Sequence, residues 1–230
     1  SRGGGAHQEG ISRVPTLRAG VEAFQRRWPG ARSPSHQSPI FLMAAGWRTG
    51  STLLQRMLSG DCLIWGEPFG QGGLLDSVPD LFRRITGFWP EESFFFRGQG
   101  RVERTCGPIE NLYPSPEDLV RAYVGFFERL FAQPAAEAGF ARWGMKTVRL
   151  SADHAFFFRW LFPPAKLVFL TRNPYHAFRS YWTISQRRGV RWFHRWPDRP
   201  VTPEHFARNW AELTAGFLEH AEELGAHFVR

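Results

Sequence analysis

The sequence contains no apolar run of about eighteen residues or more, so no segment of it is predicted to span a membrane. Cysteine is scarce too. The two cysteines, Cys62 and Cys106, are too few for a disulfide framework or a structural zinc site. Two free, unreactive thiols are the favoured state, and one disulfide between them is the alternative. Residues 1–10 contain neither Met nor the apolar core of a signal peptide, which favours a flexible lead-in or an excised fragment. The sequence does not identify the cellular compartment of the protein, and the cytoplasm is weakly favoured.

The composition indicates a globular protein with an anionic partner. The chain has 230 residues, of which 43% are hydrophobic, and its formal net charge is +8. This length and apolar content predict one domain with a substantial core. The excess positive charge predicts a phosphorylated cofactor, an acidic substrate or a nucleic acid as partner. Apart from segment 187–191 the basic residues are scattered, which argues against a nucleic acid.

The most informative segment is residues 41–58, where an apolar stretch breaks at GWRTGST (residues 46–52) and then resumes. This pattern predicts a buried strand, a tight basic loop and a helix start, an arrangement that holds phosphate or sulfate. The glycines let the backbone approach an anion, Ser51 and Thr52 add hydroxyls, and Arg48 adds a positive charge. The nucleoside-triphosphate P-loop needs Lys directly after its last Gly, where this chain has Ser51, so a P-loop nucleotide kinase is the weaker interpretation.

A second motif follows the apolar run 165–171, which is typical of a buried strand. Arg172 ends this strand. The Asn-Pro pair at 173–174 supplies an N-cap and a first helical residue, so a helix is predicted over about 175–186. Ser180 lies eight residues after Arg172, about two helical turns along. A guanidinium at the strand end and a hydroxyl on the helix can therefore converge on one anion.

Together the two motifs resemble those of the sulfotransferases that use 3'-phosphoadenosine 5'-phosphosulfate (PAPS), over about residues 38 to 230. The first loop is similar to the family's 5'-phosphosulfate loop, which implies cofactor binding by Arg48, Thr49, Gly50, Ser51 and Thr52. The second is similar to the 3'-phosphate motif, which implies that Arg172 and Ser180 bind that group. The resemblance implies sulfuryl transfer from PAPS to an acceptor hydroxyl, release of adenosine 3',5'-bisphosphate, and no metal.

The resemblance also suggests catalytic residues. Lys146 matches the Lys of the Lys-Thr-His segment in the soluble branch of the family, which implies a position beside Arg48 on the sulfate. The His of that segment is the base, but the corresponding residue here is Val148. Glu67 is the candidate base, because the tyrosylprotein and bacterial glycolipid branches place a catalytic Glu in a similar Gly-Glu segment. The alternative is His154, which is expected to be exposed near a helix start.

The acceptor is a hydroxyl compound, with carbohydrate and lipid-linked hydroxyls as the expected classes. Aromatic residues that could stack on such an acceptor, or simply pack in the core, are Trp89, Phe94, Phe95, Phe96, Trp192, Phe193 and Trp196. The alternative function is a catalytically silent domain of the same fold that binds a nucleotide or a polyanion. We expect residues 1–38 to be a flexible lead-in and residues 39–230 to be a sulfotransferase domain that is truncated at its C-terminus.

The order of elements predicts an α/β fold, a three-layer sandwich with a central parallel sheet. The family resemblance implies that this fold is P-loop-NTPase-like. Strands are predicted at 40–45, 62–65, 142–146, 165–171 and 227–229. Helices are predicted after Ser51, Ser115, Ser151, Asn173 and Thr202, the last ending at Gly225. Segment 74–111 has an irregular, aromatic pattern, which favours a lid or a substrate-facing insertion over a core layer. Ligands bind at the carboxyl ends of parallel strands, where Arg48, Glu67, Lys146 and Arg172 all fall.

Overall fold

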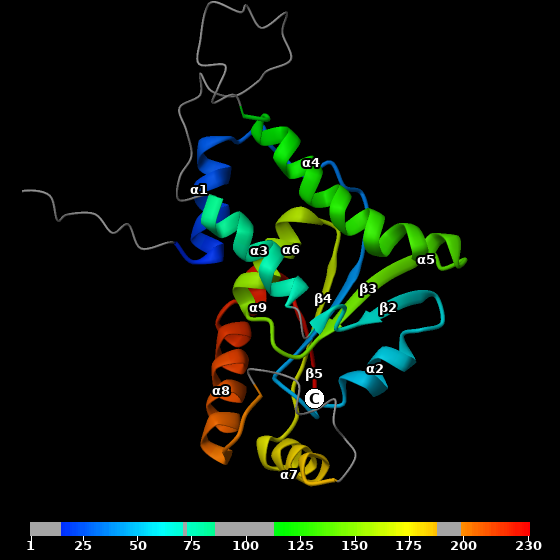
Figure 1. Ribbon diagram of the computed structural model, residues 1–230, viewed down its shortest axis with the longest axis vertical. Helices are drawn as coiled ribbons and strands as arrows, with labels where there is room; N and C mark the ends of the chain where they lie inside the picture. The colour runs from blue at the N-terminus through cyan, green and yellow to red at the C-terminus, as the bar shows by residue number, and fades with distance from the viewer. Residues whose placement is uncertain (1–14, 71–72, 86–112, 188–198) are drawn as a thin grey trace, which may run out of the picture.

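A computed structural model describes residues 15–70, 73–85, 113–187 and 199–230. Its centre is a parallel sheet of five strands in the order β2-β3-β1-β4-β5, with helices on both faces (Figure 1). The strands are β1 (Ile40–Ala44), β2 (Cys62–Gly66), β3 (Arg142–Thr147), β4 (Lys166–Leu170) and β5 (His227–Val229). The predicted α/β fold with a central parallel sheet is therefore confirmed.

The helices of the described residues include those predicted from Ser51 and after Ser115, Ser151, Asn173 and Thr202. They are α1 (Leu17–Arg27), α2 (Ser51–Met57), α3 (Leu74–Ile85), α4 (Pro116–Phe127), η4 (Glu128–Ala132), α5 (Gln133–Glu137), α6 (Ala152–Leu161), α7 (Pro174–Ser185), α8 (Pro203–Glu219) and α9 (Ala221–Leu224). Ser115, Asn173 and Thr202 each accept a hydrogen bond from a first-turn backbone N–H of the helix that follows. The single last helix that we predicted is interrupted at His220.

The two faces of the sheet carry unequal cores. Along β1, Phe41 and Met43 point into a large aromatic core, whereas Leu42 and Ala44 point into a smaller one. Phe24, Phe82, Phe127, Phe157, Phe158, Phe162 and Trp143 belong to the larger core. The smaller core also takes Ala177 and Tyr181 from α7 and Phe206 from α8, and Figure 1 shows α7 beyond the carboxyl ends of the strands.

The prediction of an irregular lid is wrong for residues 74–85, which form the helix α3. Its apolar positions Leu75, Pro79 and Phe82 recur at helical spacing and are buried. Phe82 packs edge-on against Phe24, with ring centroids 5.4 Å apart. Pro79 inside the helix obscured this pattern in the sequence, because proline usually ends a helix. The rest of the predicted lid, Trp89 and Phe94 to Phe96 included, lies outside the described residues.

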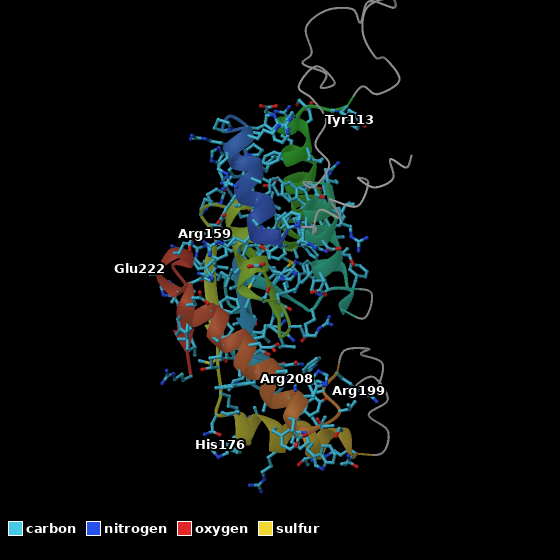
Figure 2. All side chains as sticks on the ribbon, turned by 90° about the vertical axis from the view of Figure 1, so that its left-hand side faces the viewer. Tyr113, Arg159, His176, Arg199, Arg208 and Glu222 are labelled. Atoms are coloured by element: carbon cyan, nitrogen blue, oxygen red, sulfur yellow. The ribbon has the colours of Figure 1, made fainter. Side chains whose placement is uncertain are left out.

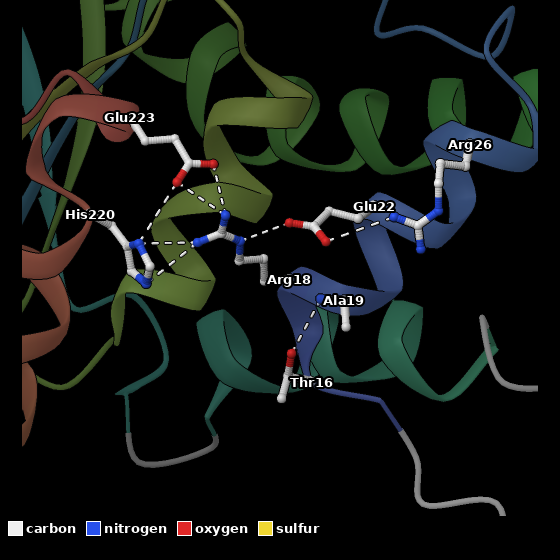
Figure 3. Close-up of polar contacts among 7 residues, drawn as sticks. All are labelled: Thr16, Arg18, Ala19, Glu22, Arg26, His220 and Glu223. Carbon is white, nitrogen blue, oxygen red and sulfur yellow. Dashed lines mark hydrogen bonds and ion pairs between the residues drawn. The ribbon is translucent and has the colours of Figure 1, made fainter.

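The predicted lead-in contains a helix that is packed into the core. Phe24 of α1 is fully buried. Arg18, on the outer side of α1, donates to Glu22 and Glu223 and contacts His220, which ties α1 to α9 (Figure 3). Thr16 caps the helix through the backbone N–H of Ala19, at 3.2 Å. Residues 17–27 are therefore held by both apolar packing and charge.

Helix α8 spans both cores. Phe206 near its start belongs to the smaller core, and Phe217 near its end belongs to the larger one, where it stacks on Phe169 with ring centroids 4.1 Å apart. Between them, the Trp210 indole N–H donates to the carbonyl oxygen of Arg172 at 3.1 Å. Helix α8 thus anchors the end of β4. Within the described ranges, each helix is too short or too polar to cross a bilayer.

Candidate functional site

The loop between β1 and α2 has an unusual backbone. Gly46, Arg48 and Gly50 have φ values of 86°, 65° and 100°, all in the left-handed region. Thr49 is buried and its hydroxyl donates to the Gly46 carbonyl oxygen at 3.3 Å, which closes the loop on itself. Arg48 is exposed as a result. Of the two hydroxyl residues that follow, Ser51 is buried and Thr52 is exposed.

Three predicted cofactor residues converge beside this loop. The Arg48 Nε donates to the Ser180 Oγ at 3.1 Å, and the Arg172 Nη1 donates to the Arg48 carbonyl oxygen at 3.1 Å. These residues lie 132 and 124 positions apart in the chain. The Asn173 side chain accepts from the backbone N–H groups of Tyr175 and His176, so it caps α7 as predicted. The predicted 3'-phosphate motif and the predicted phosphosulfate loop therefore meet.

A pocket of about 470 Å³ opens over α7 at this point, and we call it the α7 pocket. Its polar lining residues are Arg48, Arg172, His176, Arg179, Ser180, Thr183 and Arg187. Figure 2 shows His176 on α7 and Arg208 on α8 at the same end of the molecule, opposite to Tyr113. The sequence analysis missed His176, Arg179 and Arg187. The available signal was the spacing of three residues between His176 and Arg179 on the helix capped by Asn173, which places these two side by side; Arg187 follows the end of the helix.

A second cluster lies at the ends of β2 and β3. Gly66 pairs with Lys146 in the sheet, and the Glu67 N–H continues the ladder by donating to the Lys146 carbonyl oxygen at 2.8 Å. The ammonium of Lys146 forms an ion pair with the carboxylate of Glu67. The Lys146 side chain is 10% exposed and that of Glu67 is 18% exposed. Because charges this buried are costly unless they are paired, the contact holds both groups in one geometry.

His154, the alternative base, is not exposed as we expected. Only a minor part of its surface reaches solvent, and the Ser151 hydroxyl lies 3.0 Å from its Nδ1. Burial lowers the pKa of His154, and the nearby carboxylate of Asp76 opposes that change only in part. His154 is therefore engaged with Ser151, whereas Glu67 contacts Lys146 directly.

The predicted site residues thus form two groups along one edge of the sheet. Arg48, Arg172 and Ser180 follow β1 and β4, and Glu67 and Lys146 belong to β2 and β3. In the described part of the chain, the His, Cys, Asp and Glu side chains form no group of three or more that could hold a metal ion. Trp192, Phe193 and Trp196, proposed above as acceptor contacts, lie outside the described residues, as does Cys106; Cys62 is a buried free thiol.

Comparison with known proteins gives one match. The family model described as the sulfotransferase family matches residues 39–229, a range that includes both groups of residues. No curated protein and no solved structure matches the chain.

Proposed function

The chain belongs to the sulfotransferase family, and on that premise we propose that it transfers the sulfuryl group of PAPS to an acceptor hydroxyl and releases adenosine 3',5'-bisphosphate. The observation that carries the proposal is the convergence of Arg48, Arg172 and Ser180 at the carboxyl ends of β1 and β4. Guanidinium groups and a hydroxyl are the donors that bind phosphate and sulfate oxygens best. This donor set therefore fits a cofactor that carries both anions.

The proposed roles follow from position. Arg172 and Ser180 bind the 3'-phosphate, and Arg48 neutralises the 5'-phosphosulfate at the loop formed by Thr49, Gly50, Ser51 and Thr52. When bound, PAPS supplies an activated sulfuryl group. An ammonium has three donors, of which Glu67 takes one, so Lys146 can also donate to the oxygen that leaves with the bisphosphate.

Glu67 is the proposed general base. As the acceptor oxygen bonds to sulfur and the bond from sulfur to the 5'-phosphate oxygen breaks, the acceptor proton passes to the Glu67 carboxylate. The ion pair with Lys146 supports this role because it fixes the carboxylate beside the proposed sulfate contact. His154 is less well placed, since its Nδ1 is engaged by Ser151. The acceptor is proposed to be a carbohydrate or a lipid-linked hydroxyl.

The alternative is a catalytically silent domain that binds a nucleotide or a polyanion. Two observations favour it. Val148 stands where the soluble branch of the family has its base, and Glu67 is already engaged by an ammonium. A silent domain would use the α7 pocket alone, because the described residues that line it include several cations and no carboxylate.

Incubation with ³⁵S-labelled PAPS and a panel of sugar, phenol, steroid and lipid hydroxyls separates the two functions. Transfer of label to any of these acceptors, with release of adenosine 3',5'-bisphosphate, is the result expected of the enzyme. Calorimetric binding of the bisphosphate without transfer to any acceptor would favour the silent domain. A protein that does not bind the bisphosphate would contradict both the transfer reaction and a silent nucleotide-binding domain, and only polyanion binding would remain.

A further inference from the structure

A second cavity lies at the same edge of the sheet, and the roles proposed above do not involve its lining residues. It has a volume of about 400 Å³ and lies between the loop after β1, the turn after β3 and one side of α8, and we call it the α8 cavity. The loop contributes Gly46 and Trp47, and the turn contributes residues 148, 149 and 151. Figure 1 shows α8 and α2 on opposite sides of this edge, with α7 below them.

The α8 cavity adjoins both groups of proposed site residues. Gly46 lies two residues before Arg48, and Val148 lies two residues after Lys146. A molecule in the cavity is therefore next to the loop that is proposed to hold the phosphosulfate and next to the strand end that carries Lys146. In parallel α/β sheets this edge is where substrates bind.

The lining of the α8 cavity differs in chemistry from that of the α7 pocket. His205, Asn209 and Glu212 recur at helical spacing, so one side of α8 offers an imidazole, an amide and a carboxylate. The hydroxyl of Ser151 is oriented by its contact with His154, at 3.0 Å. These groups include both donors and acceptors of hydrogen bonds. Trp47 also lines the cavity; its side chain is buried, and its ring lies 6.1 Å from that of Tyr181, centroid to centroid.

The charges in the α8 cavity are balanced. Arg149 lines it, but its guanidinium donates to the Gly70 carbonyl oxygen at 2.9 Å and lies 3.8 Å from the Asp76 carboxylate. Glu212 contributes a carboxylate that repels anions. A polyanionic acceptor is therefore disfavoured here, although the net charge of the whole chain is +8. Mixed donors and acceptors beside an aromatic ring suit a molecule that carries several hydroxyls and no charge.

We propose that the α8 cavity binds the acceptor and selects a neutral, polyhydroxylated one, an uncharged oligosaccharide, through Asn209 and Glu212. Its assignment as the acceptor site rests on the proposed sulfotransferase function, whereas the binding of a neutral saccharide there does not. Ser151, held by His154, is a positioning residue for a saccharide hydroxyl.

The test measures saccharide binding with and without saturating adenosine 3',5'-bisphosphate. The probes are three neutral tetrasaccharides (maltotetraose, cellotetraose and chitotetraose) and the anionic tetragalacturonate. We expect at least one neutral probe to bind and to outcompete tetragalacturonate. The double variant Asn209→Ala/Glu212→Ala should weaken that probe by about 10- to 100-fold, since two hydrogen-bonding partners are lost, and leave bisphosphate affinity unchanged. Glu219→Ala, an exposed carboxylate of the same helix, is the matched control and should change neither.

The outcomes separate this inference from the proposed function. Failure of all neutral probes to bind, preference for tetragalacturonate, or a double variant that binds like wild type would each overturn the α8 cavity as a neutral saccharide site. If saccharides bind with the expected sensitivity but the bisphosphate does not, the sulfotransferase mechanism fails and the saccharide site stands. Where transfer occurs, the double variant should raise the acceptor KM and leave kcat within about twofold.

Discussion

The two groups of site residues differ in exposure and in charge, although they lie on one edge of one sheet. Arg48 and Arg172 are exposed cations; Arg48 donates to the Ser180 hydroxyl, and Arg172 donates to the carbonyl oxygen of Arg48. Lys146 and Glu67 are an ion pair with little access to solvent, and each has its counter-charge in the absence of ligand. Among the described residues no carboxylate is paired with Arg48 or Arg172, so the first group is suited to binding an anion. A buried pair has a fixed geometry, so the second is suited to chemistry.

The strongest test of this division is Glu67→Gln. The amide has the shape of the carboxylate but cannot accept the acceptor's proton, so turnover should fall by about 100- to 10,000-fold. Binding of adenosine 3',5'-bisphosphate, measured by calorimetry, should stay within about twofold of wild type. Glu222→Gln, at an exposed position of α9, is the matched control. Wild-type turnover in Glu67→Gln would remove Glu67 as the base and make His154 the next residue to test.

Lys146→Ala should lower transfer more than it lowers cofactor binding. Loss of a donor to the leaving oxygen typically reduces kcat by about 100- to 1,000-fold. Arg48→Ala should weaken the bisphosphate more than Lys146→Ala does, because Arg48 is also proposed to contact the 5'-phosphate. Lys166→Ala controls for loss of a lysine, since that side chain is exposed at the opposite end of the strands. Equal losses of transfer and binding in Lys146→Ala would show that Lys146 only positions the cofactor.

Arg172→Ala tests the role of the first group of site residues in nucleotide binding. Loss of a charge-assisted hydrogen bond of about 1.5 to 3 kcal/mol should weaken adenosine 3',5'-bisphosphate by about 10- to 150-fold and leave adenosine 5'-monophosphate nearly unchanged. Calorimetric titration of both nucleotides measures this difference. The control is Arg142→Ala, an exposed arginine at the start of β3. If wild type binds the two nucleotides equally, the assignment of Arg172 and Ser180 to the 3'-phosphate is wrong.

The smallest expected effect concerns His154, the alternative base. Its pKa in the folded protein lies below its ordinary value of 6.5 because of burial. At a pH between the pKa of His154 in the folded chain and that in the unfolded chain, the unfolded chain binds more protons. The free energy of unfolding should therefore fall as pH falls through and below 6.5. One such group contributes a slope of at most about 1.4 kcal/mol per pH unit. Urea unfolding at pH 7.5 and 5.5 should show a flatter dependence for His154→Gln, and an unchanged slope would contradict the role of burial.

Local sequence patterns predicted most strands, most helix starts and the order of the motifs. The N-caps Ser115, Asn173 and Thr202 were predictable because a cap depends on residues within one turn of it. Helix α3 escaped prediction because Pro79 interrupts a pattern that is otherwise helical. The likeness of two short motifs to a known family indicated the reaction class, and the family match over residues 39–229 agrees with it.

The partners within the site were decided only by the tertiary structure. Arg172 meets Arg48 because β4 pairs with β1, and Glu67 meets Lys146 because β2 pairs with β3. Strand order arises from the packing of the whole chain, so no local window of sequence contains it. The same holds for the burial of His154 and for the α8 cavity, whose walls come from three distant segments. The sequence by itself determined which groups stand at strand ends, since periodicity and capping are local, and the fold determined which of them touch.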